Sequence, residues 1–255
     1  MTAWTLHRGD SLRWLLDAPD ASVDALITDP PYSSGGQFRG DRTGSTDKKY
    51  TSSEWQGKRP DFDGDNRDQR SFLTWMSVWL WEAKRVLLPG APVVLFTDWR
   101  QLPTVTDALQ AGGMVWRGIA VWDKTGACRP QMDSFAAQAE YMVWGSNGPM
   151  PRDGRTGCLP GVFQARVDQR DKHHQTGKPT ALMREIVKIC PPGGLIFDPF
   201  TGSGTTGVAA LFEGRRFIGC ETVPEVADVA ERRLADAASA SAGTFETAPL
   251  FGGAS

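Results

Sequence analysis

Short apolar runs that end in an acidic residue recur along this chain, and they constrain its fold more than any other feature. Four of them, VDALITD, APVVLFTD, LIFD and RFIGCE, end at Asp29, Asp98, Asp198 and Glu221. Nearly continuous apolarity is typical of strands that are covered on both faces of a parallel sheet. Segments with helical periodicity, such as 71–90 and 205–215, lie between these runs. The alternation predicts an α/β fold with a doubly wound, mostly parallel sheet.

The length of 255 residues supports one large domain with a substantial core rather than two domains. We expect this domain to span 1–237 and a flexible tail rich in Ala, Ser and Gly to span 238–255. The segment 33–70 has few aliphatic residues and many charges, so we expect a loop or lid excursion there. Unstructured connections beyond about 15 residues in compact domains are usually functional.

Composition narrows the classes of function. A net charge of −2 gives no bulk electrostatic attraction to nucleic acid, so a nucleic-acid partner has to meet local basic patches. No stretch approaches the roughly 18 apolar residues of a membrane span, and the first ten residues lack the features of a signal peptide. We therefore expect a cytoplasmic protein with no membrane partner. The four cysteines form no CxxC pair, and we expect no metal site.

The stretch FDPFTGSGTTGVAALFEGRRFIGCE, residues 197–221, has the pattern of a nucleoside-binding site. A strand ends at Asp198, a turn holds Gly202 and Gly204, and a helix begins at Thr205. Glycines let a ligand approach the backbone closely, and a helix N-terminus offers amides to a polar group. The next strand ends at Glu221, where an acid can accept both hydroxyls of a ribose. The alternative is a purely structural turn. The third glycine of the dinucleotide pattern is missing, which argues against a nicotinamide cofactor.

Two motifs together carry a resemblance to a known family. DPPY, residues 29–32, and DPFTGSGTT, residues 198–206, resemble the catalytic and cofactor motifs of the S-adenosylmethionine-dependent amino-methyltransferases of DNA. The catalytic motif comes first, an order that resembles the circularly permuted beta group of these enzymes. The resemblance extends from Leu6 to about Leu234. It implies a Rossmann-like methyltransferase sheet, S-adenosyl-L-methionine as cofactor and double-stranded DNA as substrate.

The resemblance also implies which residues bind the cofactor. Asp10 is expected to reach the adenine of the cofactor from the strand that follows Glu221 in the family fold, although Asp10 also reads as a helix N-cap. HQTGKP, residues 174–179, resembles the family motif whose Thr176 and Lys178 line the methionine end of the cofactor. The remaining expected cofactor contacts are Asp198, Phe200, Gly202, Ser203, Gly204, Thr205, Thr206 and Glu221.

The expected catalytic residues are Asp29, Pro30, Pro31 and Tyr32. An exocyclic amine is a poor nucleophile because its lone pair is delocalised into the base. Asp29 can accept one N–H of the amine and the Pro30 carbonyl the other, which aims the lone pair at the sulfonium methyl; the proline ring presets the direction of that carbonyl. Tyr32 offers a stacking face to a flipped base. Direct transfer needs no general base before attack and relies on orientation. The alternative for this tetrapeptide is a strand-ending turn with a capping Asp.

Asp at the first position of the tetrapeptide favours N6 of adenine as the methylated atom, with N4 of cytosine as the second choice. A methyltransferase acting on a protein glutamine amide needs the same polarisation of an amine. That family usually has Asn in place of Asp29 and the opposite motif order. A DNA-binding protein that keeps the fold without turnover is the non-enzymatic alternative.

The family's target-recognition region falls here on 146–173, which is short for a sequence-reading domain. We therefore expect relaxed or very short sequence specificity. The excursion 33–70 mixes basic and aromatic residues that suit DNA contacts, although its acids make a solvated lid an equal alternative. The residues that we expect to contact DNA are Lys124, Arg129, Arg152, Arg155, Lys48 and Lys49.

Two further partners are expected from the sequence. Members of the family often pair, so we expect a possible homodimer. The apolar segment TAPLF, Thr247–Phe251, resembles the short peptides that dock DNA enzymes onto sliding clamps. The sequence does not distinguish restriction–modification, phage self-protection and gene regulation, because all three use the same chemistry.

Overall fold

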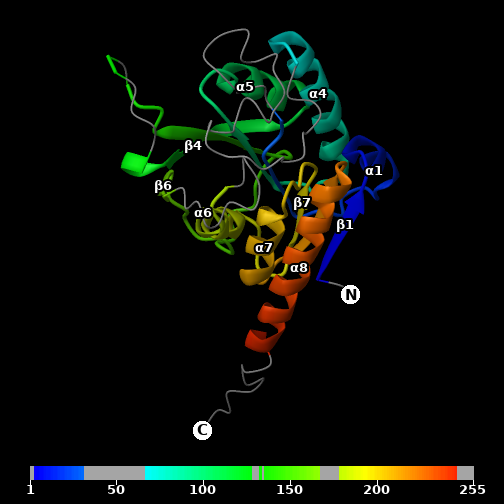
Figure 1. The fold of residues 1–255 in the computed structure, drawn as a ribbon. Helices are drawn as coiled ribbons and strands as arrows, with labels where there is room; N and C mark the ends of the chain where they lie inside the picture. The colour runs from blue at the N-terminus through cyan, green and yellow to red at the C-terminus, as the bar shows by residue number, and fades with distance from the viewer. Residues whose placement is uncertain (1–2, 32–66, 128–131, 134, 167–177, 246–255) are drawn as a thin grey trace.

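An eight-stranded sheet forms the centre of the protein (Figure 1). The structure is a computed structural model that describes residues 3–31, 67–127, 132, 133, 135–166 and 178–245. The strand order across the sheet is β1-β8-β7-β2-β3-β5-β4-β6. The strands are β1 (Trp4–Arg8), β2 (Ala25–Thr28), β3 (Pro92–Thr97), β4 (Val115–Asp123), β5 (Ala139–Ser146), β6 (Val162–Gln164), β7 (Leu195–Asp198) and β8 (Arg216–Glu221).

Helices connect most of these strands. They are α1 (Ser11–Asp17), α4 (Gln69–Val86), α5 (Leu102–Ala111), α6 (Thr180–Ile186), α7 (Thr205–Phe212) and α8 (Pro224–Phe245), with short 3-10 helices η1 (Thr125–Ala127) and η2 (Val187–Ile189). Five of the seven strand pairings are parallel, and β5 runs antiparallel to both β3 and β4. The prediction of an α/β fold with a mostly parallel, doubly wound sheet is confirmed.

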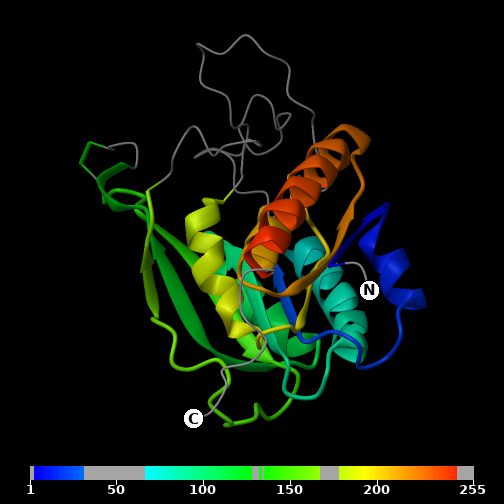
Figure 2. The same ribbon diagram turned by 90° about the horizontal axis from the view of Figure 1, so that it is seen from below.

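The sheet is the middle layer of three. Leu26 of β2 packs into a cluster with residues of α1, α4 and α5, whereas its neighbours Ala25 and Ile27 pack into a second cluster with residues of α6, α7 and α8. Successive residues of a strand point to opposite faces, so both faces of β2 are buried. Figures 1 and 2 show the two groups of helices on opposite sides of the sheet. This burial explains why the central strands are continuous apolar runs.

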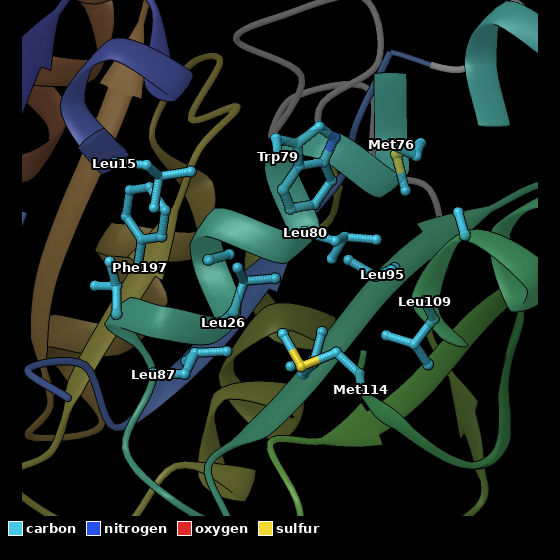
Figure 3. Packing of buried hydrophobic residues seen from close by; sticks show 14 of the residues in the cluster. Leu15, Leu26, Met76, Trp79, Leu80, Leu87, Leu95, Leu109, Met114 and Phe197 are labelled. Carbon is cyan, nitrogen blue, oxygen red and sulfur yellow. The ribbon is translucent and has the colours of Figure 1, made fainter. Parts of the chain in front are cut away.

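Helix α4 contributes most of the buried helical side chains on one face (Figure 3). Met76, Trp79 and Leu80 are fully buried and recur at the spacing of three and four residues that places them on one side of a helix. The carboxylate of Asp68 caps the N-terminus by accepting from the backbone N–H groups of Arg70 and Ser71. The sequence therefore specifies both the start of α4 and the face that it buries.

The first and the last strand of the described chain pair at one side of the sheet. Strand β1 pairs in parallel with β8, and Trp4 lies opposite Phe217. The expectation that the first strand joins the sheet beside the last one is therefore confirmed.

Two segments differ from the sequence-based prediction. Helix α8 continues to Phe245, so the expected flexible tail from residue 238 is wrong for 238–245, whose Ala-rich composition sustains the helix. Strand β6 lies inside the segment 146–173 and extends the sheet beside β4. It is only three residues long, which is too short for a period-2 pattern to reveal. No helix among the described residues is long and apolar enough to cross a membrane.

Gly207 of α7 tests how tightly this helix packs on the sheet. A Cβ at Gly207 would lie 2.5 Å from Leu234 Cδ2 and 2.6 Å from Phe217 Cδ1, and the Phe217 ring is itself buried. We predict that Gly207→Ala lowers the free energy of unfolding by about 1–3 kcal/mol, because overpacking outweighs the better helix propensity of alanine. Urea denaturation measures this change. Gly161→Ala, where a Cβ meets no atom within 4 Å, is the control and should be nearly neutral.

Candidate active site

The carboxyl ends of four neighbouring strands converge at one edge of the sheet. Strands β8, β7, β2 and β3 are adjacent and parallel, so their last residues lie along the same edge. The acids that end or follow them are Glu221, Asp198, Asp29 and Asp98. Ligands of open parallel α/β sheets bind outside this edge. The two sequence motifs that lie far apart in the chain are therefore brought together.

A hydrogen bond joins the two motifs directly. The hydroxyl of Thr28, the residue before Asp29, donates to Oδ1 of Asp198 at 2.6 Å, and both residues are buried. The backbone N–H of Phe200 donates to the same oxygen at 3.1 Å. Burial raises the pKa of Asp198 to about 6, and the charge of Asp29 adds to this rise, while hydrogen bonds from Thr28 and Thr206 oppose it. Asp198 is thus a buried structural carboxylate between β2 and the loop after β7.

Phe200 anchors the start of that loop. Its ring centroid lies 5.2 Å from that of Trp75 and 5.4 Å from that of Trp79, both on α4. These distances are typical of favourable aromatic contacts. The ring therefore fixes the loop to the helical layer below it.

Glu221 organises the other side of the loop. Its two carboxylate oxygens accept from the backbone N–H groups of Gly202 and Val223, each at 2.9 Å. Burial raises its pKa, and these backbone hydrogen bonds partly offset the rise. Each oxygen of a carboxylate can accept a second hydrogen bond. Glu221 can thus hold the loop and still accept from ligand hydroxyls.

The glycines of the loop have conformations that suit a ligand cradle. Gly202 and Gly204 have φ values of +52° and +84°, which other residues rarely adopt. A Cβ at Gly202 would meet no atom within 4 Å, whereas one at Gly204 would lie 3.3 Å from Ala230 of α8. Helix α7 begins at Thr205 without a side-chain cap. The open space beside Gly202 and the uncapped helix start fit a nucleoside-bearing cofactor.

The hydroxyl-bearing residues of the loop face the protein. The guanidinium of Arg233 on α8 donates to the Ser203 carbonyl at 2.6 Å, and to the hydroxyls of Ser203 and Thr205 at 3.1 Å each. Thr206 is buried and hydrogen-bonded to Asp198. The hydrogen bonds of these three residues are made within the protein and hold the loop in shape. Their expected contacts with the cofactor stay a prediction.

Asp29 belongs to a row of alternating charges. The ammonium of Lys178 bonds to Oδ2 of Asp29 and lies 3.6 Å from Oε2 of Glu140, and Lys124 lies 2.7 Å from Oε1 of Glu140. Burial disfavours the charge on Lys178, but Asp29 and Glu140 outweigh it and raise the pKa of Lys178. Burial likewise opposes the charge on Glu140, yet Lys178 and Lys124 lower its pKa. Lys178 and Glu140 are therefore held in their charged forms.

Asp10 lies next to the Glu221 strand end. The backbone N–H of Gly9 donates to the Glu221 carbonyl at 2.9 Å, and the Asp10 side chain accepts from the backbone N–H of Arg13 at 3.1 Å. The N-cap reading of Asp10 is confirmed. Its expected contact with the adenine of a cofactor stays a prediction.

The residues expected to contact DNA are spread apart. Lys124 is paired with Glu140 beside Asp29 instead of standing free on the surface. Arg152 follows Pro151, and the Cδ atom of Pro151 would lie 2.9 Å from a Cβ atom added at Gly90. Gly90 lies just before the start of β3, so Arg152 lies toward the edge of the sheet opposite the one that holds Asp29. Arg155 is exposed and pairs with Asp153. The structure therefore does not bring Arg152 together with Asp29.

Trp122 has a structural place. Its side chain is 3% exposed, lies in the cluster under α6, and donates from Nε1 to the Ala165 carbonyl at 2.9 Å. Trp122 is therefore a core residue in this structure.

Several predicted functional residues lie outside the described residues. They are Tyr32, Lys48, Lys49, Arg129, Thr176 and the segment Thr247–Phe251. Pro30 is buried and Pro31 half-buried directly after Asp29.

The family model of a DNA methylase, the N6/N4 methyltransferase model, matches residues 23–156 and 159–232. The chain belongs to this family. Among curated relatives, YubD of Escherichia coli strain K12, which is named as a methylase, is 31% identical over 229 residues, or 89% of this chain and 88% of YubD.

Solved structures of the family share the fold of this chain. The complex of M1.HpyAVI with SAM matches with a TM-score of 0.64 at 22% identity, and covers 91% of this chain and 98% of that one. The PvuII DNA methyltransferase, described as cytosine-N4-specific, matches with a TM-score of 0.70 at 16% identity, and covers 95% of this chain and 94% of that one. The Rossmann-like methyltransferase fold expected from the motifs is confirmed.

Sequence reasoning missed two residues that shape this edge. Glu140 is the second residue of the largely apolar strand β5, where an acid could have been recognised as unusual. Arg233 lies on α8 among other charged residues, and nothing in its local sequence distinguishes it from a solvated side chain. Of these two residues, the sequence could therefore have pointed only to Glu140, as an acid within an apolar strand.

Asp198 makes stability depend on pH. Its folded-state pKa of about 6 lies above its ordinary value of 3.8, so the folded protein binds more protons than the unfolded chain between these values. Stability from this group is therefore lost as pH rises from about 4 through 6. Asp198→Asn keeps an acceptor for Thr28 and removes the charge.

We predict that Asp198→Asn gains stability over the wild type as pH rises, by on the order of 2–3 kcal/mol between pH 4 and pH 8. Urea denaturation without cofactor at both pH values measures this gain. Asp17→Asn, an exposed change at the end of α1, serves as the control. A difference for Asp198→Asn that stays constant with pH would contradict the assignment.

Proposed function

We propose that this protein is an S-adenosyl-L-methionine-dependent DNA methyltransferase that modifies N6 of adenine. The observation that carries the proposal is the 2.6 Å hydrogen bond from Thr28 to Asp198. It places the DPP segment and the glycine-rich loop side by side on neighbouring strands. Membership of the DNA methylase family supports the same reading.

The cofactor would lie along the carboxyl edge between Glu221 and the start of α7. Glu221 would accept the ribose hydroxyls, and the open space beside Gly202 leaves room for the ligand. Asp10 would approach the adenine from β1. The cofactor supplies a methyl group activated on a sulfonium sulfur. The solved SAM complex of M1.HpyAVI, which has the same fold, supports this choice of cofactor.

Asp29 and the Pro30 carbonyl would orient the target amine. Each accepts one N–H, so the nitrogen becomes more pyramidal and its lone pair points toward the methyl group. The fixed φ of proline presets the carbonyl direction, and Pro30 is buried, which limits its movement. The nitrogen would gain the methyl group while the cofactor sulfur keeps the electron pair of the broken S–C bond, and the nitrogen would then lose one proton to water. Most of the rate enhancement would come from holding the amine in the correct orientation toward the methyl group.

The order of the motifs supports placement in the circularly permuted beta group. Strand β1, at the start of the chain, occupies the sheet position beside β8. That position is where a permuted chain needs the strand that follows the ribose-binding acid.

Adenine is favoured over cytosine because Asp29 heads the tetrapeptide. The cytosine-N4-specific PvuII enzyme shares the fold, so N4 methylation of cytosine is the second candidate. Specificity would be relaxed or short. Only β6 adds regular structure within the described part of 146–173, and Arg152 lies toward the opposite edge.

A homodimer would cover part of the exposed aromatic surface. Trp81 of α4, Trp99 after β3 and Trp116 of β4 are 60%, 63% and 44% exposed. Large exposed apolar side chains are typical of interaction surfaces.

We predict that Asp29→Ala abolishes methyl transfer while cofactor affinity stays within about threefold, because Asp29 contacts the amine and not the cofactor. Purified protein is incubated with methyl-labelled S-adenosylmethionine and separate DNA, RNA and protein substrates. Asp107→Ala, an exposed change on α5, is the matched control and should retain full activity. Retained transfer by Asp29→Ala would refute the mechanism, and labelled protein without labelled DNA would refute the substrate.

Nucleoside mass spectrometry of DNA from a methylation-deficient host should show N6-methyladenine after expression of the wild type. N4-methylcytosine in its place would select the second candidate. Methylation mapping of the same DNA should show one short or degenerate site. A single long recognition motif would contradict the expected relaxed specificity.

A further inference from the structure

A buried cation lies between two carboxylates that come from different parts of the fold. Lys178 precedes α6, Asp29 follows β2, and Glu140 is the second residue of β5. The Lys178 side chain is 8% exposed, and its ammonium lies 5.1 Å from the centre of the Phe96 ring. A lysine is almost never this buried unless it is paired. The position of its charge therefore depends on Asp29 and Glu140.

Glu140 is held from both sides. Its Oε1 lies 2.7 Å from Lys124 and its Oε2 lies 3.6 Å from Lys178, while its side chain is 19% exposed. Strand pairing places Glu140 opposite Trp122, so the sheet fixes the backbone from which the carboxylate reaches the two lysines. Glu140 thus forms a rigid anchor for Lys178 at the end of the row Asp29, Lys178, Glu140 and Lys124.

The row compensates a repulsion at Asp29. Asp29 lies close enough to Asp198 that its charge raises the pKa of Asp198. Two neighbouring carboxylates in a partly buried site favour protonation of one of them. The ammonium of Lys178 opposes that protonation at Asp29. The charged groups near Asp29 include Lys178, Asp198, Glu140 and, through Glu140, Lys124.

We propose that Lys178 and Glu140 are positioning residues that keep Asp29 ionised and fix the orientation of its carboxylate toward the target amine. This inference rests on the proposed function. Lys178 acts through Asp29, and Glu140 acts through Lys178. Asp29 is thereby kept as a hydrogen-bond acceptor with little tendency to take a proton. The role differs from a contact with the methionine end of the cofactor, the place that the sequence suggests for Lys178.

The variants Lys178→Met, Lys178→Arg and Glu140→Gln separate these roles. In Lys178→Met the carboxylates of Asp198 and Glu140 favour protonation of Asp29, because the ammonium no longer opposes it. The acid limb, which is the fall of the single-turnover rate at low pH, should therefore move up by about 1–2 pH units. Lys178→Arg should restore the limb. Glu140→Gln removes a negative charge, so it should slow the reaction while the limb stays in place or moves down. A purely structural defect would not raise the limb in Lys178→Met and leave it unraised in Glu140→Gln.

Cofactor affinity, measured by calorimetry, should stay within about threefold in all three variants, because in a positioning role neither Lys178 nor Glu140 touches the cofactor. Lys188→Met, which removes an ion pair with Glu185 outside this row, is the matched control. A tenfold loss of cofactor affinity in Lys178→Met would overturn the inference in favour of a cofactor contact. An unchanged acid limb would also overturn it.

A readout without turnover separates this inference from the proposed function. Carbon-13 NMR of the Asp29 carboxyl should show titration at higher pH in Lys178→Met than in the wild type. This holds whatever the protein methylates. If the wild type transfers no methyl group to DNA, the proposed function fails, whereas equal Asp29 titration in both proteins refutes the positioning role.

Discussion

Asp29 and Asp198 follow or end neighbouring parallel strands, so the fold holds two carboxylates close together at a partly buried edge. Such a pair is unfavourable unless each charge is compensated. Asp198 accepts hydrogen bonds from Thr28 and Phe200, and its pKa is raised. Asp29 is compensated by the ammonium of Lys178. The groups that compensate the two carboxylates therefore come from β2, from the glycine-rich loop and from the start of α6.

Different kinds of interaction hold the Glu221 side and the Asp29 side of this sheet edge. On the Glu221 side the loop is fixed by backbone N–H groups and by Arg233, which bonds a carbonyl and two hydroxyls. On the Asp29 side the elements are fixed by ion pairs between side chains. Hydrogen bonds to backbone define a surface of constant shape, whereas ion pairs respond to pH and to charge. The proposed cofactor side and the proposed amine-binding side are thus held by separate sets of contacts.

The sequence was sufficient for the parts of the structure that depend on local pattern. Apolar runs ending in acids predicted the central strands, and glycines beside Asp198 predicted the loop, because burial and positive φ leave direct traces in residue type. Pairings between distant segments leave no such trace. The contact of Lys178 with Asp29, and the clamp of Arg233 on the loop, depend on which helices lie beside which strands. For the same reason, the sequence could not show that Arg152 lies toward the far edge.

The pairing of β1 with β8 has a consequence for how the protein is made. A ribosome completes β1 before the other strands of the described residues, whereas its partner strand β8 is the last of them to emerge. Asp10 therefore takes its place beside Glu221 late, and contacts this distant in sequence form slowly. The nascent chain can pack α4 against β2 and β3 long before that moment. Closure of the sheet by its first strand would then be a late step of folding, because β1 has to wait until all the strands between it and β8 have been synthesised.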